Sequence, residues 1–298
     1  MNAWEPIATE AGDDEARAPL EVFVPHESHP GSPLVFASPH SGRIYPRRFL
    51  AAARIDAEAM RRSEDAYVDA LIDNAPNHGI PTIAARFARA YVDVNRGPWE
   101  LDPLLIDDEL PPQARTRTAR VAAGLGVIAR TAGEDGEIYA KKLTYAEAAA
   151  RVDAVHLPYH RTLAAMVAAA RERHGMTILV DWHSMPAQAA RFALGGGGCD
   201  IVLGDRFGAA ASPAISRLME RELRDLGLVV ARNAPYAGGY TTEHYGRPDA
   251  GVHAVQIEVN RALYVDQKSL TLTAGFAELK QKLERLFARL IAIDWALT

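Results

Sequence analysis

Two histidines and one glutamate stand at or near the ends of apolar, strand-like segments. His40 follows the segment 35–39, and His183 follows the segment 178–182. Glu258 lies within an apolar stretch, where a charge is rarely buried without a partner or a metal ion. Sites in open parallel sheets form outside the carboxyl ends of the strands, so we expect the two histidines to converge there. A single histidine in such a place is more often a core or capping residue, so the inference depends on the three together.

A carboxylate that would complete a metal site lies in the segment 63–66. Asp65 or Glu64 would join His40 and His183 to give three protein ligands, the pattern of a catalytic zinc ion that keeps a position for water. The alternative is that these acids stabilise the N-terminus of a helix. The residue types leave open both the role and the choice between the two acids.

Asn95 and Arg96 follow the apolar segment 90–94, which we predict to be a strand. A guanidinium at a strand end suits two-point binding of a substrate carboxylate, and a surface ion pair is the alternative. The glycine-containing segment 236–242 carries the hydroxyl of Tyr240 and is predicted to be a loop that acts as a lid or only as a turn.

A second kind of chemistry would use a serine nucleophile. Ser41 and Ser184 each directly follow one of the two histidines. Neither lies in the G-x-S-x-G turn that exposes the nucleophile of many serine hydrolases, and adjacency in sequence does not place a hydroxyl on an imidazole. Activity that survives a chelator would favour this mechanism over a metal enzyme.

Short apolar segments alternate with longer helical ones along the chain. We predict strands at residues 34–37, 82–85, 90–94, 177–181, 200–203, 228–231 and 252–259. Helical periodicity covers residues 47–74, 145–174, 213–226 and 269–293. Pro158 predicts a bend in the second of these helices and Gly175 its end, while Ser212 and Pro213 are typical of a helix start.

Continuous apolar strands between helices indicate an α/β fold whose sheet is covered on both faces. We predict a single three-layer α/β domain over residues 21–298, with a mostly parallel mixed sheet. A loose acidic tail is expected over residues 1–20.

The composition argues against several classes of protein. The 298 residues include 33 Lys and Arg against 38 Asp and Glu, and the net charge of −5 is unlike that of a general nucleic-acid binder. The single cysteine, Cys199, excludes an intramolecular disulfide and a Cys-rich metal site. No apolar run approaches the roughly 20 residues of a membrane span, and the acidic N-terminus is unlike a signal peptide. We therefore expect a soluble, cytoplasmic protein whose partner is a small molecule, not nucleic acid or membrane.

Seven motifs, taken in order, resemble the N-formylglutamate amidohydrolase family, also called N-formylglutamate deformylases. No single motif is specific, but together they run from about residue 35 to 264, most of the chain. The motifs are Ser38-Pro39-His40-Ser41-Gly42, Glu64-Asp65 with Val68-Asp69, Val92-Asp93-Val94-Asn95-Arg96, Pro158-Tyr159-His160, Asp181-Trp182-His183-Ser184, Pro235 through Tyr240, and Gln256-Ile257-Glu258.

The resemblance implies a zinc-dependent hydrolase whose fold is related to that of zinc carboxypeptidases, in the phosphorylase/hydrolase-like class. It implies one zinc ion bound by His40, Asp65 and His183. Asp65 is preferred to Glu64 because the downstream residues 68–71 then align with the family pattern without a gap.

The resemblance also implies roles for residues around the metal. Glu258 looks like the general base, and an ion pair with Arg261 is its alternative role. Arg96 looks like the anchor of a substrate carboxylate, with Asn95 beside it. The resemblance places His160 and Tyr240 at the substrate as well: we count His160, Tyr240, Asn95 and Arg96 as the substrate-binding residues.

The expected reaction is the hydrolysis of N-formyl-L-glutamate to formate and L-glutamate, which would end a route of histidine degradation. Two alternatives remain. Glu243 precedes His244 where the family pattern leads us to expect a basic residue, so the substrate can be a different N-acyl amino acid. A non-catalytic protein that binds a small acid could use the same arginine and a structural metal, since a fold does not determine function.

Overall fold

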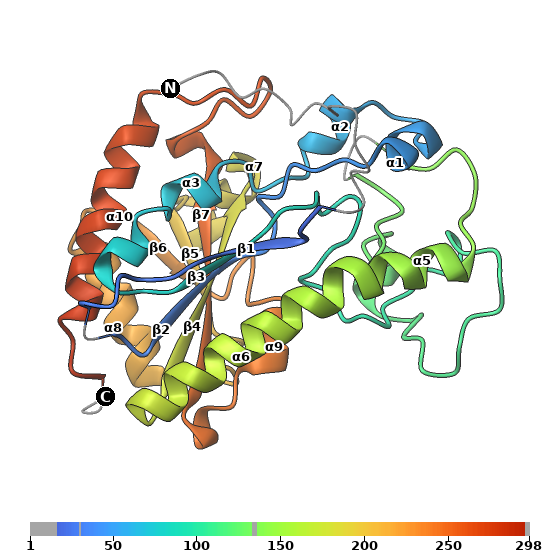
Figure 1. The fold of residues 1–298 in the computed structure, drawn as a ribbon. Coiled ribbons are helices and arrows are strands. Elements are labelled where there is room, and N and C mark those ends of the chain that lie inside the picture. The colour runs from blue at the N-terminus through green and yellow to red at the C-terminus, as the bar shows by residue number, and fades with distance from the viewer. Residues whose placement is uncertain (1–16, 30, 133–135, 296–298) are drawn as a thin grey trace. The chain divides into compact units, whose positions relative to one another are not determined.

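The computed structural model describes residues 17–29, 31–132 and 136–295 (Figure 1). Most of the predicted tail over 1–20 therefore lies outside the described residues. Two compact units divide the chain, each built from three stretches. The first unit takes residues up to 21, 39–66 and 84–162, and the second takes 22–38, 67–83 and 163 onward. The single domain expected over 21–298 stays a prediction.

A seven-stranded mixed sheet runs in the order β1-β3-β2-β4-β7-β5-β6. Its strands are β1 (Leu20–Phe23), β2 (Leu34–Ser38), β3 (Thr82–Ala85), β4 (Thr177–Met185), β5 (Ile201–Gly204), β6 (Val230–Arg232) and β7 (Val252–Asn260). β4 pairs in parallel with β2 and β7, and β5 pairs in parallel with β6. The pairing of β5 with β7 is antiparallel. The predicted α/β class with a mostly parallel mixed sheet is confirmed.

The helices of the second unit include three that pack together beside the sheet. The second unit contains α3 (Val68–Leu71), α7 (Ala187–Arg191), α8 (Pro213–Arg224), α9 (Tyr240–Tyr245), α10 (Gly275–Ile291) and most of α6 (Leu157–His174), with short 3-10 turns at Ala75–His78, Ala193–Gly196, Pro248–Ala250 and Arg261–Leu263. Helix α10 contacts both α8 and α3. Figure 1 shows α10 on one side of the sheet and α6 on the other.

The first unit holds shorter helices and much irregular chain. Its helices are α1 (Arg47–Ala52), α2 (Ala57–Arg61), α4 (Ala119–Ala122), α5 (Tyr145–Arg151), a π turn (Val152–His156) and the start of α6. The predicted helix over 145–174 is confirmed in its limits, because Thr144 caps its start and Gly175 follows its end with a φ of +75°. The irregularity expected at Pro158 takes the form of the π turn just before it.

Three predicted elements are wrong in detail. Residues 90–94 form no strand: the amides of Tyr91 and Val92 both bond back to the Ala88 carbonyl, so this apolar segment turns. Residues 47–74 divide into α1, α2 and α3: Ala53 is extended after α1, and Tyr67 takes a left-handed φ of 62° ahead of α3. The last helix begins at Gly275 instead of 269, since Asp266 holds the preceding residues in a turn.

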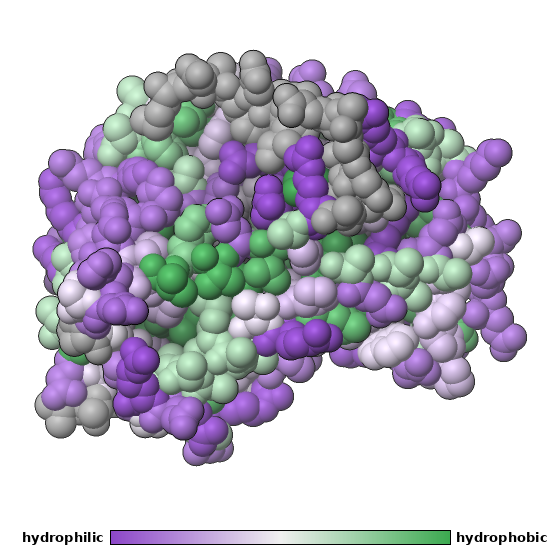
Figure 2. Space-filling view, in the orientation of Figure 1, coloured by the Kyte–Doolittle hydropathy of each residue, from purple (hydrophilic) through white to green (hydrophobic). Residues whose placement is uncertain are grey.

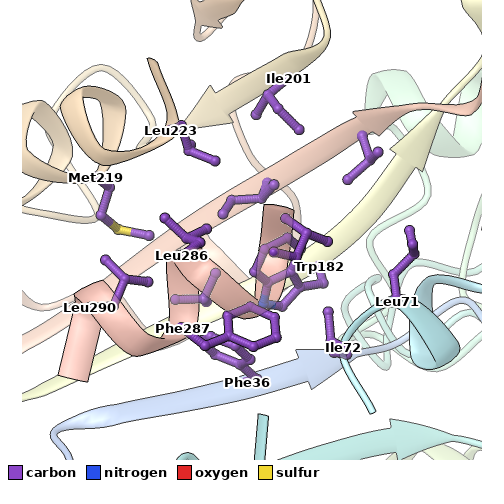
Figure 3. Packing of buried hydrophobic residues seen from close by; sticks show 14 of the residues in the cluster. Phe36, Leu71, Ile72, Trp182, Ile201, Met219, Leu223, Leu286, Phe287 and Leu290 are labelled. Atoms are coloured by element: carbon purple, nitrogen blue, oxygen red, sulfur yellow. The ribbon is translucent and has the colours of Figure 1, made fainter. Parts of the chain in front are cut away.

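A large apolar cluster lies between the sheet and helices α3, α8 and α10 (Figure 3). Phe36, Trp182 and Phe287 meet edge to face, with ring centroids 5.2–6.0 Å apart. Side chains alternate between the two faces of a strand, so this cluster takes every second residue of β4 and β7. The residues between them, including His183 and Glu258, point to the opposite face.

The surface mixes polar and apolar side chains. Hydrophilic residues cover much of the face in Figure 2, and hydrophobic residues gather in a band across it. Among residues 17–29, 31–132 and 136–295, no helix combines the length and the apolar character needed to cross a membrane.

Asp205 is a fully buried carboxylate just after β5. Oδ1 accepts hydrogen bonds from Asn233 Nδ2 at 2.8 Å and from the Gly208 amide at 3.0 Å, and Oδ2 pairs with Arg232. Burial by itself would raise the pKa of Asp205, but hydrogen bonds, from Ser216 among others, and the Arg232 charge lower that pKa below its ordinary value.

We expect Asp205→Asn to lower the free energy of unfolding at pH 7 by about 1–3 kcal/mol, because it removes a charged acceptor from buried donors. The folded-state pKa lies below the unfolded value, so this contribution is present above the unfolded value of about 3.9 and is lost as pH falls through the folded pKa. Urea unfolding at pH 7 and pH 3 measures it, with exposed Asp249→Asn as the control. A difference from wild type that is as large at pH 3 as at pH 7 would contradict this account.

Candidate active site

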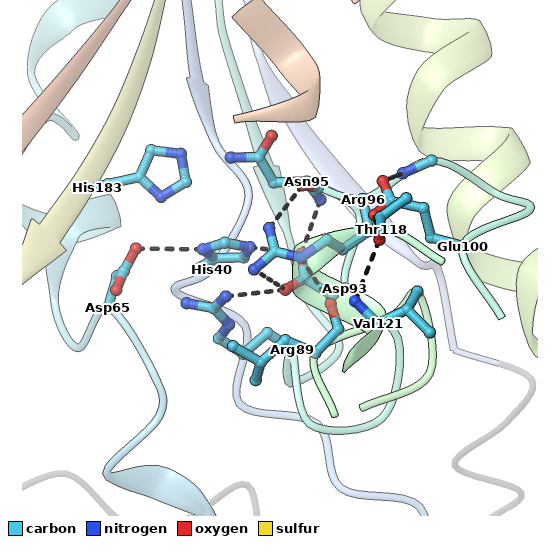
Figure 4. Close-up of polar contacts among 12 residues, drawn as sticks. His40, Asp65, Arg89, Asp93, Asn95, Arg96, Glu100, Thr118, Val121 and His183 are labelled. Carbon is cyan, nitrogen blue, oxygen red and sulfur yellow. Dashed lines mark hydrogen bonds and ion pairs between the residues drawn. The ribbon is translucent and has the colours of Figure 1, made fainter. Parts of the chain in front are cut away.

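In the first unit, His40 and Asp65 lie side by side because the Asp65 amide donates to the His40 carbonyl at 3.0 Å. Both side chains are buried, and His40 Nδ1 lies 3.3 Å from Asp65 Oδ2 (Figure 4). The other ring nitrogen, Nε2, donates to Asp93 Oδ1 at 2.7 Å. This second carboxylate fixes the tautomer of His40, so the lone pair of Nδ1 faces the Asp65 side, as a metal ligand requires.

Glu64 has different partners from Asp65. The Tyr45 hydroxyl donates to Glu64 Oε1 at 2.6 Å, and Arg61 Nε lies 3.6 Å from the same oxygen. Neither acid stands in the first turn of a helix, because α3 begins at Val68. The geometry therefore favours Asp65 as the acid that accompanies His40.

Asp93 gathers the buried charges of the first unit. Arg89 Nη2 donates to Asp93 Oδ2 at 2.8 Å, and Arg96 Nη2 lies 3.7 Å from the same oxygen (Figure 4). The backbone amide of Asn95 donates to Asp93 Oδ1 at 2.9 Å. Burial by itself would raise the pKa of Asp93, but the charges of Arg96 and Arg89 and the hydrogen bond from His40 hold it well below its ordinary value. Asp93 is therefore an anion that orients His40 and neutralises buried arginine charge.

Arg96 is buried, so its interpretation as a surface ion pair is wrong. Nε donates to the Leu125 carbonyl and Nη1 to the Asn95 carbonyl, each at 2.8 Å. Burial lowers the pKa of Arg96, and the nearby carboxylate of Asp93 opposes that shift. Two backbone carbonyls thus hold the guanidinium plane in one orientation, which suits recognition of a planar carboxylate.

His160 lies beside this loop. Its Nε2 donates to the Val94 carbonyl at 2.7 Å, and its ring centroid lies 4.4 Å from that of His156. Both imidazoles are at least nine-tenths buried. His160 thus contacts the chain that carries Asn95 and Arg96.

In the second unit, β4 and β7 bring four polar residues together on one face of the sheet. The parallel register sets Asp181 opposite Gln256 and His183 opposite Glu258. His183 Nε2 donates to Asp181 Oδ2 at 2.9 Å, and Gln256 Nε2 donates to Glu258 Oε1 at 2.8 Å. His183 therefore repeats one feature of His40, because the Nε2 of each ring is bound by a buried aspartate.

Arg261, the alternative partner of Glu258, contacts Ser184, one of the two alternative nucleophiles. Arg261 Nε donates to Ser184 Oγ at 2.9 Å, and Arg261 Nη2 approaches the Ser184 carbonyl at 3.4 Å. Adjacent side chains of a strand point to opposite faces, so Ser184 does not share the face of His183. The structure therefore gives Ser184 an arginine partner and points its side chain away from the face of His183.

Tyr240 belongs to a helix and not to a loop. It is the first residue of α9, so the predicted loop over 236–242 ends at Gly239. The Tyr240 ring stacks on His244 with centroids 5.0 Å apart, and its hydroxyl lies 3.3 Å from His244 Nδ1. Glu243, the departure from the family pattern, pairs with Arg206 at 3.4 Å.

Three side chains that bind the proposed site residues were assigned no role from the sequence: Asp93, Asp181 and His156. Asp181 was detectable, because residues two apart on a strand share a face with each other. His156 stands four residues before His160 and shares its helix face by the same reasoning. Asp93 offered only the weaker signal of an acid inside an apolar segment.

We expect Asp93→Ala to lower the free energy of unfolding by about 3–5 kcal/mol, because it leaves Arg96 buried without its carboxylate. Arg89→Ala is the matched control: about a fifth of that side chain is exposed, so its loss should cost less. Urea unfolding of metal-free protein separates this effect from ligand loss. Equal costs for the two variants would show that Asp93 does not hold the buried charge.

Comparison with known proteins shows the family of this chain. A family model described as N-formylglutamate amidohydrolase matches residues 32–265. An N-formylglutamate deformylase from Pseudomonas aeruginosa is 29% identical over 266 residues, which cover 86% of this chain and 93% of that protein. A second one, from Pseudomonas putida, is 27% identical over 268 residues, covering 86% and 92%.

Solved structures agree with the sequence comparisons. A crystal structure of N-formylglutamate amidohydrolase from Ralstonia eutropha JMP134 has a TM-score of 0.86 and 36% identity, covering 93% of this chain and 98% of that one. A gene product from Agrobacterium tumefaciens shares the fold, with a TM-score of 0.60 and 19% identity over 94% and 97% of the two chains. Because the family model matches well over half of its residues, the chain belongs to the N-formylglutamate amidohydrolase family.

Proposed function

We propose that this protein hydrolyses N-formyl-L-glutamate to formate and L-glutamate with the help of one zinc ion. The family gives the reaction class, which is hydrolysis of an amide. The observation that carries the proposal is the pair of buried histidines, His40 and His183, each oriented by an aspartate that binds its Nε2.

Zinc suits the donors that the chain offers. We propose His40, Asp65 and His183 as its ligands: all three side chains are buried, and each offers one ligand atom. Imidazole nitrogen and carboxylate oxygen are common zinc ligands, and a second carboxylate on each histidine is the usual support. Three protein ligands would keep a position for water, whose pKa zinc lowers toward about 7.

Glu258 is the proposed general base. It is the cross-strand neighbour of His183, and Gln256 holds its carboxylate by a 2.8 Å hydrogen bond. In this role the Glu258 carboxylate takes a proton from the attacking water and later delivers it to the leaving nitrogen.

Arg96 is the proposed anchor for the carboxylate of the amino acid. Its guanidinium is already fixed by two backbone carbonyls, so little side-chain freedom remains to be lost when substrate binds. We place Asn95, His160 and Tyr240 around the same substrate. Holding the substrate by its carboxylate would keep the amide carbon within reach of the attacking water.

A different N-acyl amino acid is the second candidate substrate. Glu243 pairs with Arg206 and adds a negative charge where the family pattern has a basic residue, which favours substrates with less negative charge. Assay of the purified enzyme with N-formyl-L-glutamate and a panel of N-acyl amino acids decides between them. No turnover of any of these compounds would favour a binding protein over an enzyme.

Metal analysis tests the ligand set. We expect His40→Ala, Asp65→Ala and His183→Ala each to lose most of the zinc of the wild type, because each removes one of three ligands. Glu64→Ala is the matched control and should keep its zinc, since its carboxylate is bound by Tyr45. Zinc per chain, measured after dialysis, gives the answer; loss in Glu64→Ala with retention in Asp65→Ala would reverse the assignment.

Glu258→Gln tests the base. The amide keeps nearly the same volume but cannot take a proton from water, so kcat should fall by about 10²–10⁴-fold. Zinc content and the midpoint of thermal unfolding should stay close to wild type. Loss of zinc or of stability in proportion to activity would mean that Glu258 is structural.

A further inference from the structure

One helical passage of the first unit contains a π turn. Helix α5 ends at Arg151, the π turn takes Val152–His156, and α6 continues from Leu157. Pro158 has no amide hydrogen and cannot make the regular bond to the carbonyl four residues earlier. Such turns are rare, and they occur often at functional sites.

The side chains at the two ends of the π turn, Arg151 and His156, are held by hydrogen bonds. At one end, the Arg151 guanidinium lies 4.6 Å from the Tyr91 ring centroid and 5.5 Å from that of Tyr139, and its Nη1 donates to the Tyr139 hydroxyl at 2.6 Å. At the other end, His156 Nε2 donates to the Arg96 carbonyl at 2.8 Å. A carbonyl can only accept, so Nε2 of His156 carries the hydrogen.

The π turn allows Arg151 and His156 to contact the same stretch of chain. In a regular α-helix of 3.6 residues per turn, side chains five apart differ by about 140° around the axis. A turn closed by bonds between residues i and i+5 is wider, and it brings Arg151 and His156 nearer to one side. Both then reach the same stretch of chain, residues 91–96, and His160 follows one α-helical turn later on that side.

That stretch of chain is held by bonds from outside it. It forms turns and no strand; its Asp93 amide donates to the Val127 carbonyl at 2.8 Å, and its Arg96 amide bonds back to the Asp93 carbonyl at 3.2 Å. The His156 imidazole supplies the donor that the buried Arg96 carbonyl requires. His156 is 1% exposed, so solvent competes little for this bond.

We propose that His156, presented by the π turn, is a positioning residue that sets the place of the Arg96 guanidinium and thereby the affinity for the substrate carboxylate. The inference rests on the proposed function, because it takes Arg96 as the carboxylate anchor. His156 itself touches no reacting atom. Its effect therefore belongs to KM and not to kcat.

The test compares variants that differ in their ability to donate. His156→Phe keeps a ring but no donor, and His156→Gln restores an N–H on a side chain of sufficient length. We expect His156→Phe to raise KM for N-formyl-L-glutamate about 10-fold or more with kcat within about threefold, and His156→Gln to recover most of the loss. Zinc content should not change. His174→Phe, at the far end of the same helix, is the matched control and should leave KM unchanged.

A second substrate distinguishes positioning from general damage. With N-formyl-L-isoglutamine, in which an amide replaces the α-carboxylate, wild type and His156→Phe should have the same kcat/KM. An equal loss on both substrates, or an unchanged KM on the acid, would overturn the proposal. If His156→Phe fails to fold, His156→Asn, whose amide is too short to reach, takes its place beside His156→Gln. A wild type inactive on N-formyl-L-glutamate would overturn the proposed function together with this inference, whereas failure in the variants alone would overturn only the inference.

Discussion

The two-residue alternation of side chains on β4 and β7 is the constraint on which the second unit depends. One face of these strands supplies Trp182 and Ile257 to the apolar cluster under α10. The other face carries His183 and Glu258, set opposite each other by the parallel register. A slip of one residue would exchange the two faces and bury the polar residues in the core. Packing under α10 therefore fixes the position of the polar pair as firmly as it fixes the core.

Buried charge creates the corresponding constraint in the first unit. Asp93 accepts from His40 and Arg89 and lies near Arg96, so one carboxylate serves an imidazole and two guanidinium groups. Burial would raise the pKa of Asp93, but this pKa stays low because two guanidinium groups lie near its carboxylate and His40 donates a hydrogen bond to it. Residues 90–96, which include Asp93, belong to no strand. Side-chain hydrogen bonds to backbone carbonyls, at Leu125 and Arg96, take the place of a sheet ladder.

The two proposed histidine ligands have the same kind of support. Each proposed histidine ligand has its Nε2 bound by a buried aspartate. Fixing the tautomer and orientation in advance lowers the cost of ordering the ligands when the ion binds. Arg96 is likewise oriented before substrate arrives. Preorganisation is thus the physical principle shared by the proposed metal and substrate positions.

The sequence by itself determined the class of fold, the strands around His40, His183 and Glu258, and the family, because apolar runs and ordered motifs are local signals. It also predicted the limits of the helix over 145–174, since capping residues act locally. The family resemblance ranked Asp65 above Glu64, but only the tertiary structure showed their different partners, because Asp65 lies against His40 and Glu64 is bound by Tyr45. Only the tertiary structure showed that residues 90–94 form a buried loop instead of the predicted strand, since apolar composition reports burial and not backbone conformation. Hydrogen bonds between residues far apart in sequence made that choice.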